Sequence, residues 1–272
     1  MAWIAVPAPS TVPDSERSAA ALASATGDRS EPVGDAFPAH GLPDYLQRTY
    51  RWAYLDRRML YWLDRPAVVS AILWGNAGRL MDAAASCFDG GQHVLQAAAV
   101  YGDFSLRLAR RLGQHGRLEV LDAAPLQVAN LRRKLRGHGN VRARVHDLRR
   151  PLTRRYDGVC CFFLLHEVPA EMRRCIVDNL LAAVEPGGSV VFVDYHRPHA
   201  GHPLRWPMQW VFNRFEPFAA SLLGQDLTTL AGQRSDFEWR RTLFFGGMYQ
   251  LVVARSIVLS ECKHNREVFA SV

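Results

Sequence analysis

Between Gly90 and Tyr195 the chain alternates apolar segments of strand length with amphipathic segments of helix length. Strands are predicted over 93–98, 118–122, 140–147, 156–165 and 189–195, and helices over 104–113, 125–137 and 171–188. This alternation is typical of parallel strands joined by helices that cover both faces of one sheet. It predicts an α/β fold with a mostly parallel sheet, to which the rest of the chain is added.

Three segments flank this alternation on its amino and carboxyl sides. Residues 1–42 are rich in Ala, Pro, Ser and Gly and bury too little apolar surface to offset chain entropy, so a disordered tail is predicted. Residues 259–272 are expected to be a second tail. Residues 43–89 carry apolar side chains at helical spacing and predict a cap of N-terminal helices before the sheet.

Residues 90–258 are expected to form the catalytic domain. Near its end, two apolar runs joined at Gly246-Gly247 predict an antiparallel hairpin at the sheet edge. Residues 197–237 interrupt the alternation with an apolar, aromatic insertion that also contains Arg205 and Arg214. Such an insertion suits a lid or tunnel for an apolar ligand, or a helix in a membrane interface. A helix packed on the sheet is the alternative.

Charge and cysteine content narrow the possible partners and the compartment. The net charge is +7, and Lys134 and Lys263 are the only lysines. Arginine binds anions through its planar, forked guanidinium group, but a solvated arginine-rich surface is the favoured explanation of the excess. No RNA-binding motif is apparent, so no nucleic-acid partner is expected. Five cysteines without CxxC spacing indicate free thiols in a reducing, cytoplasmic compartment, and no apolar run is long enough to predict a transmembrane helix.

Carboxylates follow two neighbouring strands of the predicted sheet. Ligands of doubly wound sheets bind beyond the carboxyl ends of the strands. Asp122 ends the second strand and could accept hydrogen bonds from both ribose hydroxyls of a nucleoside. Asp147 ends the third and could accept one from an adenine amino group. Either residue alone could be a simple turn or cap residue, but together they favour a nucleoside pocket.

The loop after the first strand departs from the usual nucleotide-binding turn. In VLQAAAVYGDFS, Ala98 and Val100 stand where glycines are expected, and only Gly102 is retained. The stretch is consistent with a damaged site, a different fold, or a site altered for different chemistry.

The element order, the acid ending the second strand and the stretch EPGGSVVFVDY resemble the class I S-adenosylmethionine-dependent methyltransferases, over about Tyr45 to Ser256. The resemblance implies a Rossmann-like fold, a mostly parallel sheet with an antiparallel edge strand, and S-adenosylmethionine as cofactor. That family usually has an acid at the position of Gln96 and glycines at those of Ala98 and Val100. These departures argue against ordinary methyl transfer.

A narrower resemblance is carried by YLQRTYRWAYLD, ILWGNAGRLMDAA, VLQAAAVYGDFS, CFFLLHEVP and VDYHRPHAGHPLR. Together these stretches resemble the rhodoquinone-biosynthesis family, RquA. The family implies that a methoxy group of ubiquinone is replaced by an amino group, with S-adenosylmethionine as nitrogen donor and a requirement for manganese. The altered loop would then present the amino end of the cofactor to the quinone. Because ubiquinone is dissolved in the lipid bilayer, we expect a cytoplasmic enzyme that associates peripherally with the inner membrane.

Site residues are predicted from this resemblance and from the strand ends. Cofactor contacts are expected from Gln96, Ala97, Ala98, Tyr101, Gly102, Asp103, Phe104, Asp122, Asp147 and Leu148. The predicted catalytic residues are His166, Glu167 and Tyr50. The predicted manganese ligands are Glu167, Asp194 and His196, because carboxylate oxygen and imidazole suit this ion. Asp122 or Asp147 could belong to an alternative metal shell.

These residues also have purely structural interpretations, and three other functions are possible. Asp194 and His196 could only cap a strand end, His166 could be a hydrogen-bonded core histidine, and Tyr50 could pack in the core. The first rival function is a conventional methyltransferase acting on a quinone or another small molecule. The others are a non-catalytic module that binds lipid or protein and an RNA methyltransferase.

Overall fold

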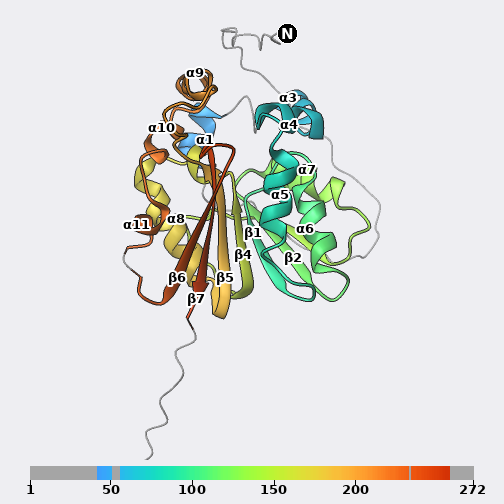
Figure 1. Cartoon of the computed structure of the whole chain (residues 1–272). Helices are drawn as coiled ribbons and strands as arrows, with labels where there is room; N and C mark the ends of the chain where they lie inside the picture. Colours follow the sequence, from blue (N-terminus) through green and yellow to red (C-terminus); the bar gives the residue numbers. More distant parts are fainter. Residues whose placement is uncertain (1–41, 51–55, 233, 258–272) are drawn as a thin grey trace, which may run out of the picture. The chain divides into compact units, whose positions relative to one another are not determined.

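The computed structural model describes residues 42–50, 56–232 and 234–257. The tails expected over 1–42 and 259–272 therefore lie outside the described residues, except for Leu42. The described part contains a seven-stranded sheet in the order β3-β2-β1-β4-β5-β7-β6 (Figure 1). Its strands are β1 (His93–Ala97), β2 (Arg117–Asp122), β3 (Val141–Val145), β4 (Tyr156–Phe162), β5 (Val184–Tyr195), β6 (Phe237–Phe244) and β7 (Tyr249–Ser256).

Strand directions confirm the predicted α/β fold. Strands β1 to β5 pair in parallel, whereas β7 runs antiparallel to both β5 and β6. The hairpin predicted around Gly246-Gly247 is thus β6 and β7, at one edge of the sheet. Between β1 and β4 the strand order reverses, which creates the crevice where ligands of such sheets bind.

Helices cover both faces of the sheet and also lie above the carboxyl ends of its strands. The first face carries α5 (Ala77–Ala85), α6 (Phe104–Leu112) and α7 (Pro125–Lys134), and the other carries α8 (Ala170–Ala182), α10 (Ala219–Leu222) and α11 (Leu227–Leu230). The helices at the carboxyl ends of the strands are α1 (Asp44–Thr49), α3 (Arg57–Leu63), α4 (Pro66–Ile72) and α9 (Arg205–Phe215) (Figure 1). Among the described residues no helix has the length and apolar character needed to span a bilayer.

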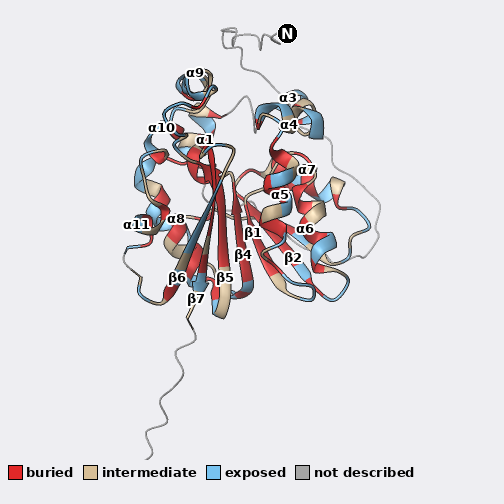
Figure 2. Cartoon of the chain, in the orientation of Figure 1, coloured by how far each residue is buried: buried red, intermediate tan, exposed pale blue. Residues whose placement is uncertain are grey.

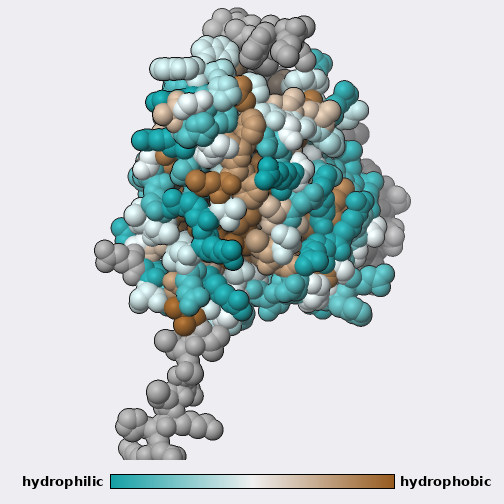
Figure 3. All heavy atoms as spheres, viewed as in Figure 1, coloured by the Kyte–Doolittle hydropathy of each residue, from teal (hydrophilic) through white to brown (hydrophobic). Residues whose placement is uncertain are grey.

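Alternation along the strands produces a separate hydrophobic core on each face. In β4, Cys160 packs in the core beneath α5 and α6, and its neighbour Cys161 packs in the core beneath α8. The same division separates Val191 from Phe192 in β5, as expected for side chains that alternate with period two. The central strands β1, β4 and β5 are accordingly mostly buried, whereas the edge strand β6 is largely exposed (Figure 2). On the face seen in Figure 3, hydrophobic residues gather in the middle and hydrophilic residues lie on both sides.

The largest error in a predicted boundary lies between α8 and β5. The helix expected to continue to residue 188 ends at Ala182, and β5 begins at Val184, so the Pro186-Gly187-Gly188 turn lies within the strand. Proline lacks the N–H that a helix interior needs, which ends the helix early. Pairing of β4 with β5 shifts register here, and a Cβ at Gly188 would collide with the Asp157 carbonyl.

Candidate functional site

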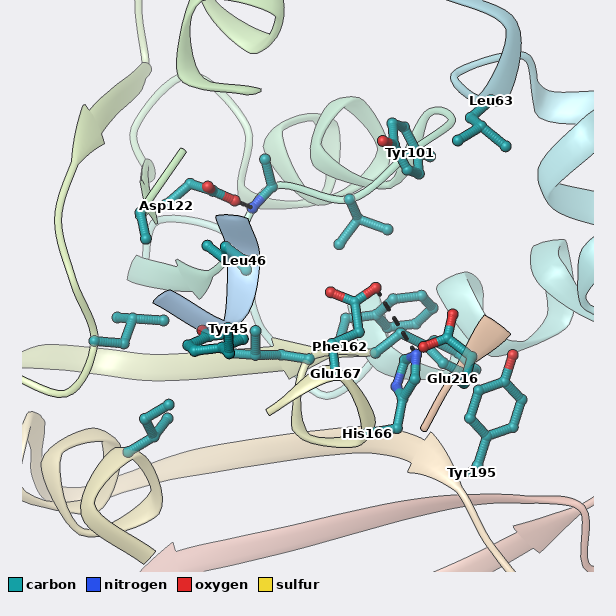
Figure 4. A pocket seen from close by; sticks show the side chains of 18 of the residues that line it. Tyr45, Leu46, Leu63, Tyr101, Asp122, Phe162, His166, Glu167, Tyr195 and Glu216 are labelled. Atoms are coloured by element: carbon teal, nitrogen blue, oxygen red, sulfur yellow. Dashed lines mark hydrogen bonds and ion pairs between the residues drawn. The ribbon is translucent and has the colours of Figure 1, made fainter. Parts of the chain in front are cut away.

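A cavity of about 180 Å³ opens at the carboxyl ends of the parallel strands, at the point where the strand order reverses. Loops after β1, β2, β3 and β4 form its floor, and α1, α3 and α4 contribute apolar side chains to its walls (Figure 4). Residues predicted to contact the cofactor that do line it are Ala98, Tyr101, Asp122, Asp147 and Leu148. Of the residues predicted from sequence, these are the ones in position to touch a bound nucleoside.

The other predicted cofactor residues support the cavity from beneath or beside it. Phe104 is fully buried and stacks on Phe162 at a centroid distance of 4.3 Å, so it belongs to the core. Asp103 binds the Arg107 side chain at 2.9 Å. Gln96, Ala97 and Gly102 likewise do not line the cavity.

The loop after β1 keeps the backbone shape of a glycine turn without the glycine. Ala98 has φ of +68°, a left-handed conformation that side chains with a Cβ adopt at a cost. Its N–H donates to the Leu121 carbonyl at 2.8 Å, and its own carbonyl accepts from Gln96 Nε2 at 2.9 Å. The buried Oε1 of Gln96 has no hydrogen-bond partner among the described residues. An amide therefore holds this loop where the methyltransferases usually have an acid.

A buried ion pair, which the sequence interpretation missed, ties this loop to the N-terminal helices. Asp64, directly after α3, accepts the Gly102 N–H at 2.9 Å and lies 2.6 Å from Lys134 Nζ on α7. Lys134 also donates to the Gly102 carbonyl, and Asn130 donates to Asp64 at 3.1 Å. The two charged side chains are 11% and 16% exposed. The only sequence signal was that Lys134 is one of two lysines.

The two strand-end aspartates differ in environment. Asp122 accepts the N–H groups of Ala99 and Ala124 at 2.8 and 2.7 Å, and burial raises its pKa to about 6 although these bonds oppose the shift. For Asp147, burial favours a higher pKa, but the guanidinium of Arg149 outweighs it and lowers the pKa. Arg149 Nε lies 2.9 Å from Asp147 Oδ2. Asp147 therefore reaches the cavity already paired with a cation.

A second group of polar side chains lies across the cavity from Asp122. His166 and Glu167 belong to the 3₁₀ turn η1 (Leu165–Glu167) after β4, and Glu216 follows α9 in the insertion. His166 Nε2 lies 3.9 Å from Glu167 Oε1, and one ligand atom from each of the three residues lies within 4.8 Å of the others. Figure 4 shows the three side chains pointing toward one another. We call them the His–Glu–Glu cluster.

Asp194, at the end of β5, orients the histidine of this cluster. Its Oδ1 lies 2.8 Å from His166 Nδ1, and the same buried carboxylate accepts the N–H groups of Leu165 and Tyr195. A proton on Nδ1 leaves Nε2 turned toward Glu167, the arrangement by which a carboxylate orients a metal-binding histidine. Burial alone would lower the pKa of His166, but Asp194 and the two glutamates raise it to about 9. The imidazole is therefore protonated at neutral pH when no cation is bound.

Tyr50 and Arg173 hold the cluster from the outside. The Tyr50 hydroxyl donates to Glu216 Oε2 at 2.8 Å, and burial together with this carboxylate raises its pKa. Burial also raises the pKa of Glu216, although His166 and Tyr50 oppose the shift. Arg173, which is fully buried, donates to the carbonyls of Leu165 and Phe218, one in the η1 turn and one in the insertion. Tyr50, predicted to be catalytic, thus lies in contact with the cluster.

The structure brings together a different set of candidate metal ligands from the predicted one. Of the predicted ligands, Glu167 lies in the cluster. Asp194 does not, because its carboxylate is hydrogen-bonded to His166 Nδ1. His196 does not either, because its Nδ1 is hydrogen-bonded to the Gly247 carbonyl at 2.8 Å, in the hairpin. Glu216 takes their place and was missed, although it is the only acid in the apolar run 202–223. One imidazole and two carboxylates match the donor set that manganese accepts. Within the described ranges this is the single group of three such side chains.

Comparison with known proteins agrees with this geometry. Residues 94–188 match a family described as a methyltransferase domain. This part of the chain is therefore similar to a methyltransferase domain. The matched span runs from β1 into β5 and so includes the loop with Ala98, Asp122 and the η1 turn. Among curated proteins, none matches the chain.

Solved structures share the fold at low sequence identity. An O-methyltransferase family protein from Burkholderia thailandensis is 15% identical, with a TM-score of 0.55 over 80% of this chain and 69% of that one. A SAM-dependent methyltransferase from Aquifex aeolicus is 15% identical, with a TM-score of 0.52 over 74% and 99%. The N-methyltransferase NodS from Bradyrhizobium japonicum, in complex with S-adenosyl-L-homocysteine, is 15% identical, with a TM-score of 0.51 over 79% and 99%. The family match and this fold support an S-adenosylmethionine-dependent, methyltransferase-like enzyme.

Proposed function

We propose that this protein converts ubiquinone to rhodoquinone, replacing one ring methoxy group by an amino group with S-adenosylmethionine as nitrogen donor and manganese as cofactor. The observation that carries the proposal is the pairing of two features in a methyltransferase-like domain. One is the altered loop, with Gln96 and Ala98 at the positions of an acid and a glycine. The other is the His–Glu–Glu cluster, which faces the same cavity.

In this proposal the cofactor occupies the side of the cavity formed by the loops after β1 to β3. The Asp122 carboxylate retains lone pairs beyond its two backbone bonds and accepts from the ribose hydroxyls. Leu148 and Asp147 border the adenine. The loop at Ala98 to Tyr101 directs the amino-acid end of the cofactor toward the cluster, with no carboxylate at position 96 to hold its amine.

In the same proposal His166, Glu167 and Glu216 hold the manganese ion. The bound ion would supply Lewis-acid polarisation of a quinone oxygen, which makes the ring carbon more electrophilic toward an amine. Asp194 keeps the imidazole in the tautomer that frees Nε2, and Tyr50 keeps Glu216 aimed at the cavity. Because unliganded His166 is protonated at neutral pH, binding of the ion must release that proton.

The quinone itself fits the apolar side of the cavity. Its walls there are apolar side chains of α1, α3, α4 and the residue after α4, namely Leu46, Leu63, Val69, Ile72 and Leu73. A long isoprenoid tail needs such a lining. We place the reaction at the cytoplasmic side of the inner membrane, where this substrate is available.

Mass spectrometry of the products tests the proposal against its main rival. Purified protein is incubated with ubiquinone, S-adenosylmethionine and manganese, and in parallel without manganese. A manganese-dependent product with an amino group in place of one methoxy group is expected. The fold and the family match favour one second candidate, a conventional methyltransferase, which would instead yield a methylated product.

A further inference from the structure

Exposed hydrophobic side chains are concentrated on the helices that lie at the carboxyl ends of the strands. Among the described residues, five large hydrophobic side chains are exposed, and four of them lie on α3, α4 and α9. These are Tyr61 on α3, Ile72 on α4, and Trp206 and Trp210 on α9, with exposed fractions of 63, 48, 76 and 60%. We call these four side chains the rim surface. Exposed hydrophobic side chains that gather in one place, unlike single scattered ones, mark sites of contact with a protein or a membrane.

The rim surface is continuous with the cavity. Ile72 is both half-exposed and part of the cavity lining. Trp74, just after α4, donates from Nε1 to Met208 Sδ at 2.8 Å and so joins α4 to α9. Trp206 and Trp210 are four residues apart and therefore lie on one side of α9, while Met208 and Phe212 form its buried side. Figure 1 shows α3, α4 and α9 at the same end of the sheet, above the strand ends.

Charge at the rim indicates what covers it. Helices α3 and α9 contain two arginines each, Arg65 directly precedes α4, and none of the three helices contains an acidic residue. Arg65 lies over the ring of Tyr61 at 5.2 Å, and Arg205 lies over the ring of Trp206 at 5.6 Å. Aromatic rings that seat at headgroup depth beside guanidinium groups that bind phosphate are the elements by which proteins attach to an anionic bilayer.

We propose that the rim surface docks this protein on an anionic lipid bilayer, with the cavity mouth facing the membrane. The inference deepens the proposed function and rests on it for the route of the substrate, since a bilayer-dissolved quinone would enter between α4 and α9 without crossing water. The attachment to the bilayer is peripheral, because only side chains of the rim surface make it.

Sedimentation with lipid vesicles tests the docking without cofactor or quinone. The full chain is mixed with phosphatidylcholine vesicles or with vesicles that also contain phosphatidylglycerol, at low and high salt. Binding is expected only to the anionic vesicles and should weaken with salt. The pair Trp206→Ser and Trp210→Ser should lose binding by about tenfold or more, because two large aromatic surfaces no longer leave water. Arg205→Ala should lose about fivefold.

Matched controls come from exposed residues outside the rim. Leu243→Ser on β6 removes a side chain as exposed as Ile72, and Arg110→Ala removes an arginine from the last turn of α6. Both variants should bind vesicles as the wild type does. Absence of vesicle binding, or equal loss in rim and control variants, would overturn the docking and leave a protein partner as the occupant. Vesicle binding without an aminated product would contradict only the proposed function.

Discussion

The Asp64–Lys134 ion pair provides a quantitative test of how the cavity is built. Lys134→Met keeps the length of the side chain and removes its charge, leaving Asp64 with the Gly102 N–H and Asn130 as donors. Both side chains are mostly buried, and breaking a buried pair by removing one partner costs about 3–5 kcal/mol. Because Asp64 keeps two donors, the lower end applies, so we expect a loss of about 3 kcal/mol. For a domain of this size that corresponds to a fall in Tm of roughly 6–12 °C.

Urea unfolding of four proteins gives the assay for this prediction. The wild type, Lys134→Met, Asp64→Leu and the double variant form a double-mutant cycle. The double variant should be more stable than Lys134→Met alone, because no unpaired carboxylate is left buried. A loss below about 1 kcal/mol for Lys134→Met, as for a surface pair, would refute the reasoning that this pair is buried and joins the α3 end to the loop.

Three further predictions concern the cavity. Glu216→Gln should lower manganese affinity by at least about tenfold in calorimetry and leave cofactor affinity unchanged, and equal affinity for manganese would exclude Glu216 as a ligand. Protonation of Asp122, whose pKa burial raises to about 6, should weaken S-adenosylmethionine binding as the pH falls through 6, and Asp122→Asn should abolish that pH dependence. His166 has a pKa raised to about 9 when folded, so in metal-free protein it contributes about 3 kcal/mol of stability that is full below pH 6.5 and is lost as the pH rises through 9. The stability difference between wild type and His166→Gln in urea should shrink over that range, and a constant difference would contradict the assigned charge.

Local sequence pattern was sufficient to predict the sheet and its edge. Continuous apolar runs at 156–165 and 189–195 and the turn at Gly246-Gly247 are signals within single segments, so the strands and the hairpin followed from them. The order of the strands came only from the structure. The end of α8 was misplaced because Val184 reads equally well as helix or strand, and only pairing with Tyr156 decides it.

The cavity was predictable only where its residues follow strands. Asp122 ends β2 and His166 lies in the turn after β4, and the fold brings the carboxyl ends of these strands to one edge of the sheet. Glu216 reaches the cluster from the insertion, whose placement depends on tertiary contacts such as Arg173 with Phe218 and Tyr50 with Glu216. Nothing in the local sequence specifies such contacts between distant segments. The left-handed backbone conformation of Ala98 could not be predicted from the sequence either, because alanine disfavours that conformation.

Product analysis by mass spectrometry, with ubiquinone, S-adenosylmethionine and manganese, tests the central claim most directly. The account predicts a quinone in which one methoxy group has been replaced by an amino group, formed by the wild type only with manganese. Nitrogen-labelled S-adenosylmethionine should carry its label into that product. A methylated product, or an aminated product without the label, would contradict the account.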